Sequence, residues 1–290
     1  MSSPPAPLTE FFASHERVFV LTGACVSTAS WIPDYRDHNG EWKHQKPMEY
    51  RDFVGSVAAR QRYWARSYFG WRHFSRAAPN PAHQALAGLE QLGRLVHTVT
   101  QNVDGLHQRA GSRLLTELHG SLSSVDCLDC GGRFARPDLQ QALLQRNPQL
   151  STLSGEITPD GDARLRDFDE THLDIPACRC CGGILKPAVV FFGESVPRDR
   201  VQQCRDALAV ADALLVVGSS LMVYSGFRFV REAAQMGIPI VAVNRGRTRA
   251  DELLHFKFEL DCATALSASL AQLTRGSITP PDRECDAVPR

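Results

Sequence analysis

The sequence predicts an α/β fold in which a doubly wound, mostly parallel sheet carries a smaller inserted domain. Three observations lead to this prediction: strand-length apolar runs that end in small or polar residues, helical stretches between them, and two cysteine pairs that interrupt the alternation. β-Branched runs of this kind suit strands that are buried on both faces, as in a parallel sheet. The runs are Val18–Thr22, Leu95–Thr100, Ala213–Val217, Ile238–Val243 and Phe256–Leu260.

Two helices between these runs can be placed from the sequence. Asn80-Pro81 is typical of a helix start, with the asparagine as N-cap and the proline in the first turn. Val201–Ala211 is predicted to form the helix before the third run. In sheets of this type ligands bind beyond the carboxyl ends of the strands. The polar residues that follow each run are therefore the first candidates for function.

The composition is that of a globular protein with a substantial core. The 290 residues include 43% hydrophobic and 22% charged residues, and a length of this kind suits about two domains of roughly 150 residues each. The net charge is +0 and no basic block occurs, so nucleic acid is not an expected partner. No run approaches the ~18 apolar residues of a membrane span, and the start has no secretory pattern. We therefore expect a cytoplasmic protein without membrane association, whose oligomeric state the sequence leaves open.

Four segments fall outside the regular alternation. Residues 33–52 are polar and broken by proline and glycine, and we expect a loop over the site. Residues 55–76 are predicted to be helical, with aromatic side chains that pack in a core. Residues 151–174 are acidic, which predicts an exposed insertion. The Pro-rich, charged tail 276–290 is expected to be disordered.

Two C-x-x-C pairs predict a structural zinc site. They are Cys127-x-x-Cys130 and Cys178-x-x-Cys181, and a Gly-Gly step follows the second cysteine of each pair. Four thiolates in tetrahedral geometry bind zinc and leave no open position for catalysis. In a chain without an export signal, metal binding is a better interpretation of such pairs than disulfides.

The turn after the first run is a candidate nucleotide site. Residues 22–27 have the sequence Thr-Gly-Ala-Cys-Val-Ser and are expected to open a helix. Such a turn can present backbone N–H groups to a pyrophosphate. The G-x-G-x-x-G pattern is incomplete, because Cys25 stands at its second glycine, so the turn alone leaves nucleotide binding open. The next segment, Ile32-Pro-Asp-Tyr-Arg36, could contact a phosphate, cover a ring or form a salt-bridged loop.

Polar residues also follow the second run. The segment Gln101-Asn-Val-Asp-Gly-Leu-His107 carries amide and carboxylate groups suited to a ribose or a carboxamide. Further along, His119 lies just before the segment bounded by the cysteine pairs. A single histidine is usually structural, but its place beside this polar cluster makes His119 the candidate general base.

Taken together, these segments resemble the sirtuins, the NAD-dependent protein deacylases. The matching blocks follow the family's order and, with both cysteine pairs, extend over roughly residues 10 to 270. They are Thr22-Gly-Ala, Ile32-Pro-Asp-Tyr-Arg36, Gln101-Asn-Val-Asp-Gly-Leu-His107, Glu117-Leu-His-Gly120, Lys186-Pro-Ala-Val-Val-Phe-Phe-Gly-Glu194, Gly218-Ser-Ser-Leu221 and Asn244-Arg-Gly246. Further stretches, including Tyr224-Ser-Gly-Phe-Arg228, are similar to the class II branch, which contains the fourth mitochondrial sirtuin of animals. We expect a bacterial relative.

The resemblance implies an NAD-binding, Rossmann-like domain with a zinc-binding insertion. The first would comprise 10–120 and 183–272, with 33–76 as cofactor loop and helical part of the small domain, and the insertion 121–182. One structural zinc ion would be held by the four paired cysteines. The implied NAD-binding residues are Gly23, Ala24, Cys25, Thr28, Ile32, Pro33, Asp34, Tyr35, Arg36, Gln101, Asn102, Asp104, Gly218, Ser219, Ser220, Asn244, Arg245, Gly246 and Cys262.

The implied reaction removes an acyl group from a lysine of a protein substrate. The acyl oxygen attacks the ribose carbon as nicotinamide leaves, and His119 then acts as base on a ribose hydroxyl. Asn102 and Asp104 complete the implied catalytic set beside the nicotinamide. The products are nicotinamide, O-acyl-ADP-ribose and free lysine. The substrate would add as a strand between the segment after Ser220 and a segment whose implied substrate residues are Val190, Phe191, Phe192, Gly193 and Glu194.

Tyr63 and Arg66 are candidates for recognition of the acyl group. They are three residues apart on a predicted helix and so share one face. In the desuccinylating branch of the family, a similar Tyr-x-x-Arg pair binds acyl groups that end in a carboxylate, a task suited to the guanidinium fork. An ordinary surface arginine is the alternative.

Two other functions stay open. One is mono-ADP-ribosyl transfer to protein, which keeps the NAD chemistry and changes the acceptor. The other is a catalytically weak module that senses NAD or ADP-ribose, because Cys25 and Trp31 stand where the family has glycine. If the second of those glycines had a positive φ, tryptophan there would cost of order 1 kcal/mol or more.

Overall fold

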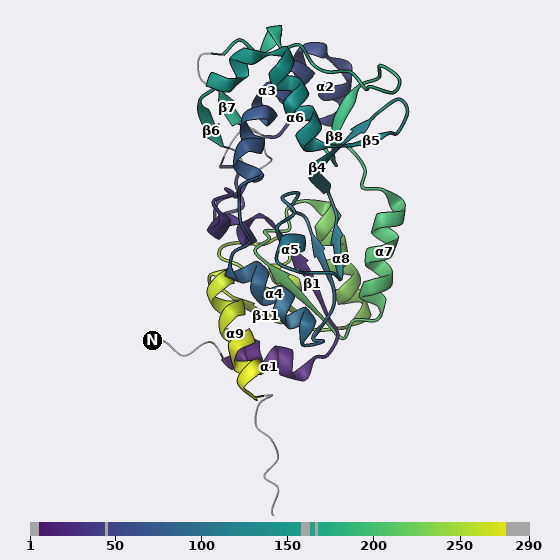
Figure 1. Ribbon diagram of the computed structural model, residues 1–290. Helices are drawn as coiled ribbons and strands as arrows, with labels where there is room; N and C mark the ends of the chain where they lie inside the picture. The colour runs from purple at the N-terminus through teal and green to yellow at the C-terminus, as the bar shows by residue number, and fades with distance from the viewer. Residues whose placement is uncertain (1–5, 44–45, 158–162, 166–167, 277–290) are drawn as a thin grey trace, which may run out of the picture.

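Two lobes make up the chain in the computed structural model, which describes residues 6–43, 46–157, 163–165 and 168–276 (Figure 1). The large lobe contains a six-stranded sheet, and the small lobe a three-stranded and a two-stranded sheet. The predicted disordered tail lies outside the described residues, except for Gly276, which ends a helix. In the described part of the chain, no helix combines the length and the apolar character that a membrane span needs.

The large sheet is parallel throughout and has the order β11-β10-β9-β1-β2-β3. Its strands are β1 (Val18–Thr22), β2 (Leu95–Thr100), β3 (Leu115–Glu117), β9 (Ala213–Val217), β10 (Ile240–Val243) and β11 (Phe256–Phe258). All five predicted runs are therefore strands of one sheet. β10 starts two residues late because the Ile238 N–H donates to Ala233 O at the end of the preceding helix, and Pro239 has no N–H to donate.

The strand order reverses beside β1, and this reversal creates a crevice. From β1 the chain moves to β2 and β3 on one side, and later to β9, β10 and β11 on the other. The carboxyl ends of β1 and β9 consequently meet, with Gly23 N–H donating to Val217 O at 3.1 Å. A switch point of this kind is the usual ligand site of a doubly wound sheet.

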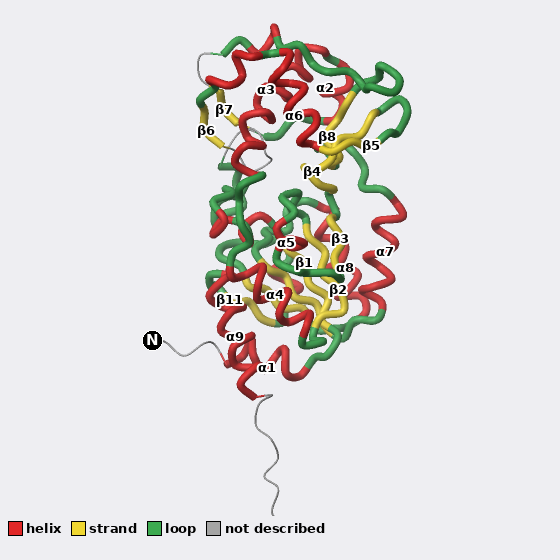
Figure 2. Tube along the Cα trace, in the orientation of Figure 1, coloured by secondary structure: helices red, strands yellow, loops and turns green. Residues whose placement is uncertain are grey.

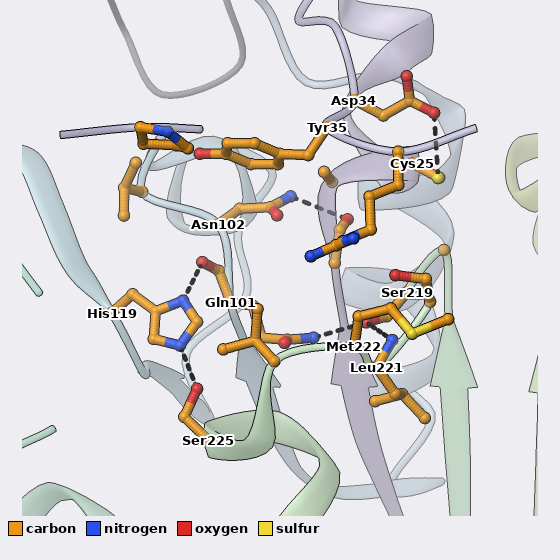
Figure 3. A pocket seen from close by; sticks show the side chains of 18 of the residues that line it. Cys25, Asp34, Tyr35, Gln101, Asn102, His119, Ser219, Leu221, Met222 and Ser225 are labelled. Atoms are coloured by element: carbon orange, nitrogen blue, oxygen red, sulfur yellow. Dashed lines mark hydrogen bonds between the residues drawn. The ribbon is translucent and has the colours of Figure 1, made fainter. Parts of the chain in front are cut away.

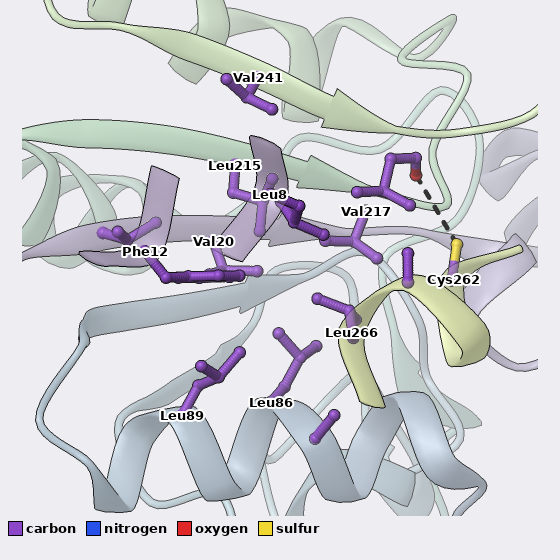
Figure 4. Close-up of a cluster of buried hydrophobic side chains, with 14 of the residues drawn as sticks. Leu8, Phe12, Val20, Leu86, Leu89, Leu215, Val217, Val241, Cys262 and Leu266 are labelled. Carbon is purple, nitrogen blue, oxygen red and sulfur yellow. Dashed lines mark hydrogen bonds between the residues drawn. The ribbon is translucent and has the colours of Figure 1, made fainter. Parts of the chain in front are cut away.

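Helices cover both faces of the large sheet, as predicted for a doubly wound fold (Figures 1 and 2). One face packs against α1 (Ala6–Ser14), α4 (Pro81–Gln91) and α9 (Cys262–Gly276), and the other against α7 (Arg198–Ala209) and α8 (Tyr224–Met236). Alternate residues of each strand point to opposite faces. In β1, Val18 and Val20 join the first core, shown in Figure 4, and Phe19 and Leu21 the second.

The start of α4 confirms the predicted cap. Asn80 Oδ1 accepts the Ala82 N–H at 2.9 Å, and His83 Nδ1 accepts the Asn80 N–H at 3.3 Å. The amide of Asn80 also donates to Val26 O at 2.7 Å, which ties α4 to the turn after β1. The capping residue thus fixes both the helix and the segment that leads into the crevice.

The small lobe is built on an antiparallel sheet of order β5-β4-β8. Its strands are β4 (Gly120–Cys127), β5 (Arg133–Ala135) and β8 (Leu185–Val189). The packed helices are α2 (Tyr50–Gly55), α3 (Val57–Phe74) and α6 (Arg136–Arg146). As predicted for residues 55–76, most of this segment is helical, and aromatic side chains such as the fully buried Trp64 lie in a core. β8 pairs with β4, so residues 185–189 belong with the small lobe rather than with the large domain expected from residue 183.

The acidic segment 151–174 is more closely packed than the sequence predicted. Its described parts include the hairpin β6 (Gly155–Ile157) and β7 (Ala163–Leu165) and the 3₁₀ turn η4 (Glu170–His172). Ala163 and Leu173 are buried. This segment is therefore, in part, a wall of the small-lobe core rather than only an exposed insertion.

The chain crosses between the lobes several times (Figure 2). Residues 118–119 connect β3 of the large sheet to β4 of the small one, and residues 190–197 return from β8 to α7. The predicted base His119 lies on the first of these crossings.

Candidate active site

A cavity of about 900 Å³ lies at the carboxyl ends of the large sheet and reaches into the small lobe. It is lined by the ends of β1, β2, β9 and β10, by the loop after β1, by the β8–α7 crossing and by the start of α8 (Figure 3). The predicted residues among its lining are Gly23, Ala24, Cys25, Thr28, Asp34, Tyr35, Arg36, Tyr63, Gln101, Asn102, His119, Val190, Phe191, Phe192, Gly193, Glu194, Gly218, Ser219, Ser220, Asn244, Arg245 and Cys262. Ile32, Pro33, Arg66, Asp104 and Gly246 are not among them.

Two glycines let the strand ends meet closely. A Cβ on Gly23 would lie 2.7 Å from Ser219 Cβ, and one on Gly218, whose φ is +59°, would lie 2.7 Å from Val26 N. Real Cβ atoms do not approach backbone so closely, so both positions require glycine. The absence of side chains at these two positions lets the ends of β1 and β9 pack directly against each other.

The turn after β1 differs from its prediction. It forms the 3₁₀ turns η1 (Ala24–Val26) and η2 (Thr28–Ser30) instead of opening an α-helix. The Cys25 N–H donates to Gly218 O at 3.0 Å. That N–H is therefore engaged and does not point to a pyrophosphate. Burial and the nearby Asp34 carboxylate raise the pKa of the Cys25 thiol to about 12, so it stays protonated.

Asn244, at the end of β10, carries an orphaned acceptor. Its side chain is 2% exposed, and its Nδ2 donates to Arg245 O at 3.0 Å and Gly246 O at 3.3 Å. Its Oδ1 is buried with no hydrogen-bond donor among the described residues. A buried acceptor without a partner costs about 1–3 kcal/mol. A hydroxyl of a bound sugar would supply that missing donor, so this end of the cavity fits one half of a dinucleotide.

The end of β2 holds a chain of hydrogen bonds that starts at Asn102. Its Nδ2 donates to Gly23 O at 3.1 Å and to Ser27 Oγ at 3.0 Å, and Ser27 Oγ donates to Asp104 Oδ2 at 2.7 Å. Asp104 also accepts the Leu106 N–H at 2.9 Å, at the start of α5 (Leu106–Arg109). Burial raises the pKa of Asp104, and the Ser27 hydroxyl opposes that shift. Asp104 thus lies behind the lining and acts on the cavity through Ser27 and Asn102.

His119 is held from both ring nitrogens (Figure 3). Nδ1 lies 2.9 Å from Gln101 O, and Nε2 lies 2.7 Å from Ser225 Oγ. A carbonyl oxygen only accepts, so Nδ1 carries the proton and Nε2 offers its lone pair to the Ser225 hydroxyl. Burial, helped by the nearby Arg200 and Arg228, lowers the pKa of His119 to about 4. The ring is therefore neutral near pH 7, as a general base must be.

The loop over the cavity, predicted for residues 33–52, ends where α2 begins at Tyr50, and it is closed by aromatic contacts. The Arg36 guanidinium lies 3.9 Å from the Trp42 ring centroid and donates to Gly40 O at 2.7 Å. Trp42 meets Phe192 of the β8–α7 crossing edge to face, with ring centroids 5.7 Å apart. Within the described part of the loop, these contacts connect the two walls of the cavity.

Trp31 stands apart from the cavity. Its φ of 64° lies in the left-handed region, and its side chain is 83% exposed. Trp31 therefore has the positive φ that was considered for this position, where the family has glycine. The indole points into solvent and leaves the cavity free.

Tyr63 and Arg66 have different surroundings in the structure. Tyr63 is buried and lines the cavity, with its ring 5.3 Å from that of Phe191. Arg66 lies outside the lining, and its Nε is 2.7 Å from Glu170 Oε1. Only the tyrosine of the predicted pair therefore lines the cavity.

The four paired cysteines converge at the end of the small sheet. Their sulfur atoms all lie within 4.8 Å of one another, with Cys127 to Cys181 at 3.5 Å and Cys130 to Cys178 at 3.8 Å. Zinc–sulfur bonds of about 2.3 Å in a tetrahedron give sulfur–sulfur distances of about 3.8 Å. The donor set and its spacing fit one structural zinc ion.

The two halves of this cluster have the same backbone turn. Cys127 N–H donates to Gly132 O at 2.8 Å, and Cys178 N–H donates to Gly183 O at 2.9 Å. Each turn contains a glycine at positive φ, Gly131 at 70° and Gly182 at 76°. The Gly-Gly step after each cysteine pair therefore forms the turn that closes that half of the cluster.

Comparison with known proteins agrees with this geometry. The model of the Sir2 family matches residues 23–225. The chain belongs to the Sir2 family. It is 55% identical over 260 residues to "NAD-dependent protein deacetylase 2" of Bradyrhizobium diazoefficiens, covering 90% of this chain and 95% of that protein. An "NAD-dependent protein deacetylase" of Xanthomonas axonopodis pv. citri is also 55% identical, with 90% of this chain and 89% of the relative covered.

Solved structures of Sir2 proteins share the fold. One described as "Sir2-p53 peptide-NAD+" has a TM-score of 0.72 at 27% identity and covers 94% of this chain and 98% of its own. Another, "Structure of Sir2Tm bound to a propionylated peptide", has a TM-score of 0.71 at 26% identity, with 94% and 99% covered. The doubly wound sheet with a smaller inserted lobe is therefore the Sir2 fold.

Sequence reasoning missed two site residues of this Sir2 protein. Ser225 and Arg228 both line the cavity from the first turn of α8. Their spacing of three residues places them on one helix face. That spacing, after the polar end of β9, was the available signal, but only the fold brings α8 next to His119.

Proposed function

We propose that this Sir2 protein is an NAD-dependent protein-lysine deacetylase, acting on acylated lysines of proteins in the bacterial cytoplasm. The observation that carries the proposal is a neutral histidine, His119, in the lining of a cavity that also contains the glycines at the ends of β1 and β9 and an unpaired acceptor on Asn244. Such a cavity combines a dinucleotide site with a base. Relatives with 55% identity that carry this name support the same activity.

The residues along the cavity would have different roles in binding and catalysis. When bound, NAD supplies a ribose carbon that is activated by its bond to nicotinamide and can accept an acyl oxygen. Gly23 and Gly218, which line the cavity, would face the dinucleotide with their backbone, and Asn244 Oδ1 would accept a ribose hydroxyl. Asn102, whose Nδ2 donates to Gly23 O and to Ser27 Oγ, would present its Oδ1 to the nicotinamide end. His119 Nε2 would take the proton of a ribose hydroxyl, because Nδ1 is committed to Gln101 O.

The peptide would lie between the β8–α7 crossing and the start of α8. Several backbone groups on that crossing are already paired: Val190 N–H with His119 O at 2.8 Å, and Phe191 N–H with the Glu194 carboxylate at 2.9 Å. Phe192 is also paired, because its carbonyl oxygen accepts the Tyr50 N–H at 2.8 Å, so strand addition would use the backbone groups of Gly193. Glu194 is itself fixed by an ion pair with Lys186 at 3.0 Å, which keeps this wall in place.

The test is nicotinamide release by the purified protein with NAD and a set of acyl-lysine peptides. We expect release that depends on the peptide, and a loss of about 10²–10⁴-fold in deacylation for His119→Ala, the usual contribution of a general base. The matched control is His97→Ala, because His97 contacts Thr116 on the edge of the sheet, outside the cavity. Deacylation that persists in His119→Ala would remove this histidine from the base role.

Intact protein mass separates the rival functions. Transfer of ADP-ribose to an acceptor protein adds mass, whereas deacylation removes an acyl group. A protein that binds NAD without releasing nicotinamide would be a sensor. The sensor hypothesis was based on Cys25 and Trp31, which stand where the family has glycine. Of these two residues, Cys25 lines the cavity and Trp31 does not, which favours an enzyme.

A further inference from the structure

Ser225 is hydrogen-bonded to the basic nitrogen of His119. It lies in the first turn of α8, and its Oγ is 2.7 Å from Nε2 of the ring. Because Nδ1–H donates to Gln101 O, Nε2 has no proton, and the Ser225 hydroxyl must be the donor. The one lone pair through which His119 can act as a base is therefore already in use.

A substrate hydroxyl can reach this base in two ways. It can displace Ser225, which breaks the 2.7 Å hydrogen bond to Nε2, or it can bond to Ser225 itself. After donating to Nε2, Ser225 Oγ still has two lone pairs that can accept. Both Ser225 and His119 line the cavity, so a bound hydroxyl can approach Ser225 without any rearrangement of the ring.

We propose that Ser225 relays the proton from a ribose hydroxyl of the substrate to His119. The substrate O–H gives its proton to Ser225 Oγ while the Ser225 proton passes to Nε2, and the substrate oxygen forms its bond to the acyl carbon. His119 then carries one positive charge and returns the proton through the same path to the departing lysine nitrogen. As that nitrogen leaves, the oxygen of one water bonds to the acyl carbon and one of the two bonds between the acyl group and the ribose breaks. One proton of that water goes to the freed ribose oxygen and the other to solvent, so O-acyl-ADP-ribose forms and the enzyme ends unchanged. This inference rests on the proposed deacetylase function.

The surroundings suit a relay that begins with a neutral ring. The charged groups that act on His119 are Arg200 and Arg228, and both oppose its protonation. The Gln101 carbonyl opposes them and stabilises the charged ring once it forms. The donor from Ser225 favours the neutral form before reaction.

The test compares Ser225→Ala and Ser225→Thr with the parent enzyme in two assays. Exchange of labelled nicotinamide into NAD needs cleavage of the cofactor but not the base, whereas formation of O-acyl-ADP-ribose needs both. We expect Ser225→Ala to slow product formation by about 10²-fold, within the range for lost proton transfer, and to leave exchange and KM for NAD within about twofold. Ser225→Thr, which keeps a hydroxyl, should recover most of the rate. Ser123→Ala, an exposed serine of β4, is the control.

Two results would overturn the relay. One is a Ser225→Ala enzyme with the parent rate; the other is an equal loss of exchange and product formation, which would point to damage of the site as a whole. A third measurement needs no turnover: ¹⁵N NMR of the His119 ring should show the proton on Nδ1. A proton on Nε2 would contradict the relay even if the protein proved to have another activity.

A separate observation on the same helix concerns Arg228. Its side chain is half-buried in the cavity lining, and its Nε is buried with no hydrogen-bond partner among the described residues. Two other cations of the lining have partners, Lys43 with Asp34 at 2.6 Å and Arg36 with Trp42 and Gly40, whereas the Arg228 guanidinium lies over an aromatic ring, 5.5 Å from the Tyr224 centroid. A half-buried guanidinium without a carboxylate is costly unless a ligand brings one.

We infer that Arg228 binds a carboxylate carried by the substrate, either on the acyl group or on a side chain beside the modified lysine. Arg228 shares a helix face with Ser225, which contacts the base. An anion at Arg228 would therefore lie near the base and the reacting acyl group. A planar guanidinium is well suited to a carboxylate because it can donate two parallel hydrogen bonds. This inference also rests on the proposed function.

The test uses three peptides that differ only in charge: acetyl-lysine with neutral neighbours, acetyl-lysine beside aspartate, and succinyl-lysine with neutral neighbours. We expect Arg228→Gln to lower kcat/KM about tenfold for the carboxylate source that the enzyme prefers, and less than about twofold for the neutral peptide. Arg231→Gln, on the exposed side of α8, is the control. An equal loss on all peptides, or a raised KM for NAD, would overturn the inference. Peptide affinity by calorimetry gives the same comparison without turnover.

Discussion

The two lobes bury their cores in different ways. The large lobe places apolar side chains on both faces of one parallel sheet, and helices cover each face. The small lobe has short antiparallel strands, an aromatic cluster around Trp64, and four converging thiols. It also buries a whole guanidinium: Arg136 is 0% exposed and lies between the rings of Trp64 and Trp71, 5.4 and 5.3 Å from their centroids.

This difference shows where single residues matter. In the large lobe the burial energy is spread over many equivalent side chains, so one substitution removes a fraction of it. In the small lobe a few groups with specific chemistry replace much of that area. We therefore expect damage to the small lobe to be concentrated at a few positions.

Metal removal tests the comparison most strongly. Chelation, or Cys178→Ser, should unfold the small lobe while the large sheet persists, because structural zinc contributes apparent free energies of about 10–16 kcal/mol in small domains. Calorimetry with zinc analysis would follow both lobes. Cys180→Ser is the matched control, since Cys180 is exposed and outside the four-sulfur cluster. Equal zinc loss in Cys180→Ser would contradict the assignment of the ligands.

A core truncation in the large lobe should have a smaller and more uniform effect. Leu86 is 0% exposed in the core between α4 and the sheet (Figure 4). Leu86→Ala should lower the free energy of unfolding by about 2–5 kcal/mol. Leu92→Ala, at a residue 39% exposed, should change it by much less. Urea unfolding would measure both, and similar losses would contradict the packing of α4.

Acid should weaken the large lobe first. His83 and His107 are buried with rings 4.8 Å apart, and burial lowers their pKa values to about 4 and about 3. As the pH falls below the ordinary histidine pKa of about 6.5, the unfolded chain binds protons that the folded chain does not. Stability should thus fall by about 1.4 kcal/mol per pH unit for each ring.

Urea midpoints between pH 7 and pH 5 would measure this slope. His172 of the small lobe, exposed beside Asp169, offers the control. The slope should persist in His172→Gln and decrease in His83→Gln. A slope that is unaffected by His83→Gln would assign the acid sensitivity to other groups.

The smallest expected effect is a gain in the free energy of unfolding. Trp31 has a left-handed backbone with its indole in solvent, and this conformation costs roughly 1–2 kcal/mol for a residue with a Cβ. Trp31→Gly should raise the free energy of unfolding by about 1 kcal/mol, because little packing is lost. Thermal melting would detect it, and Trp31→Ala, which keeps the strain, should give no such gain. A loss in Trp31→Gly would mean that the indole has a contact of its own.

Much of the large lobe could be predicted from the sequence, and less of the small one. The bounds of β1, β2 and β9 follow from apolar runs that end in polar residues. β8 could not be found in this way, because it contains Pro187 and the buried Lys186, whose charge is matched by Glu194 only in the folded chain. β4 carries serines at alternate positions and has no continuous apolar signal.

The residues of the site also differ in whether the sequence could predict them. Residues directly after strands, such as Asn102 and Ser219, could be placed because parallel strands bring their carboxyl ends together. The expected role of Arg66 has no support, because Glu170, which is 104 residues away in the chain, pairs with it. Ser225 was missed for the converse reason: its contact with His119 spans 106 residues.

The position of His119 between two sheets has a mechanical consequence. Leu118 and His119 alone separate β3 of the large sheet from β4 of the small one. A rotation of one lobe about this crossing would displace groups far from it more than the imidazole, since points on an axis do not translate. The base would keep its alignment with Gln101 while the walls of the cavity change their separation around a bound peptide.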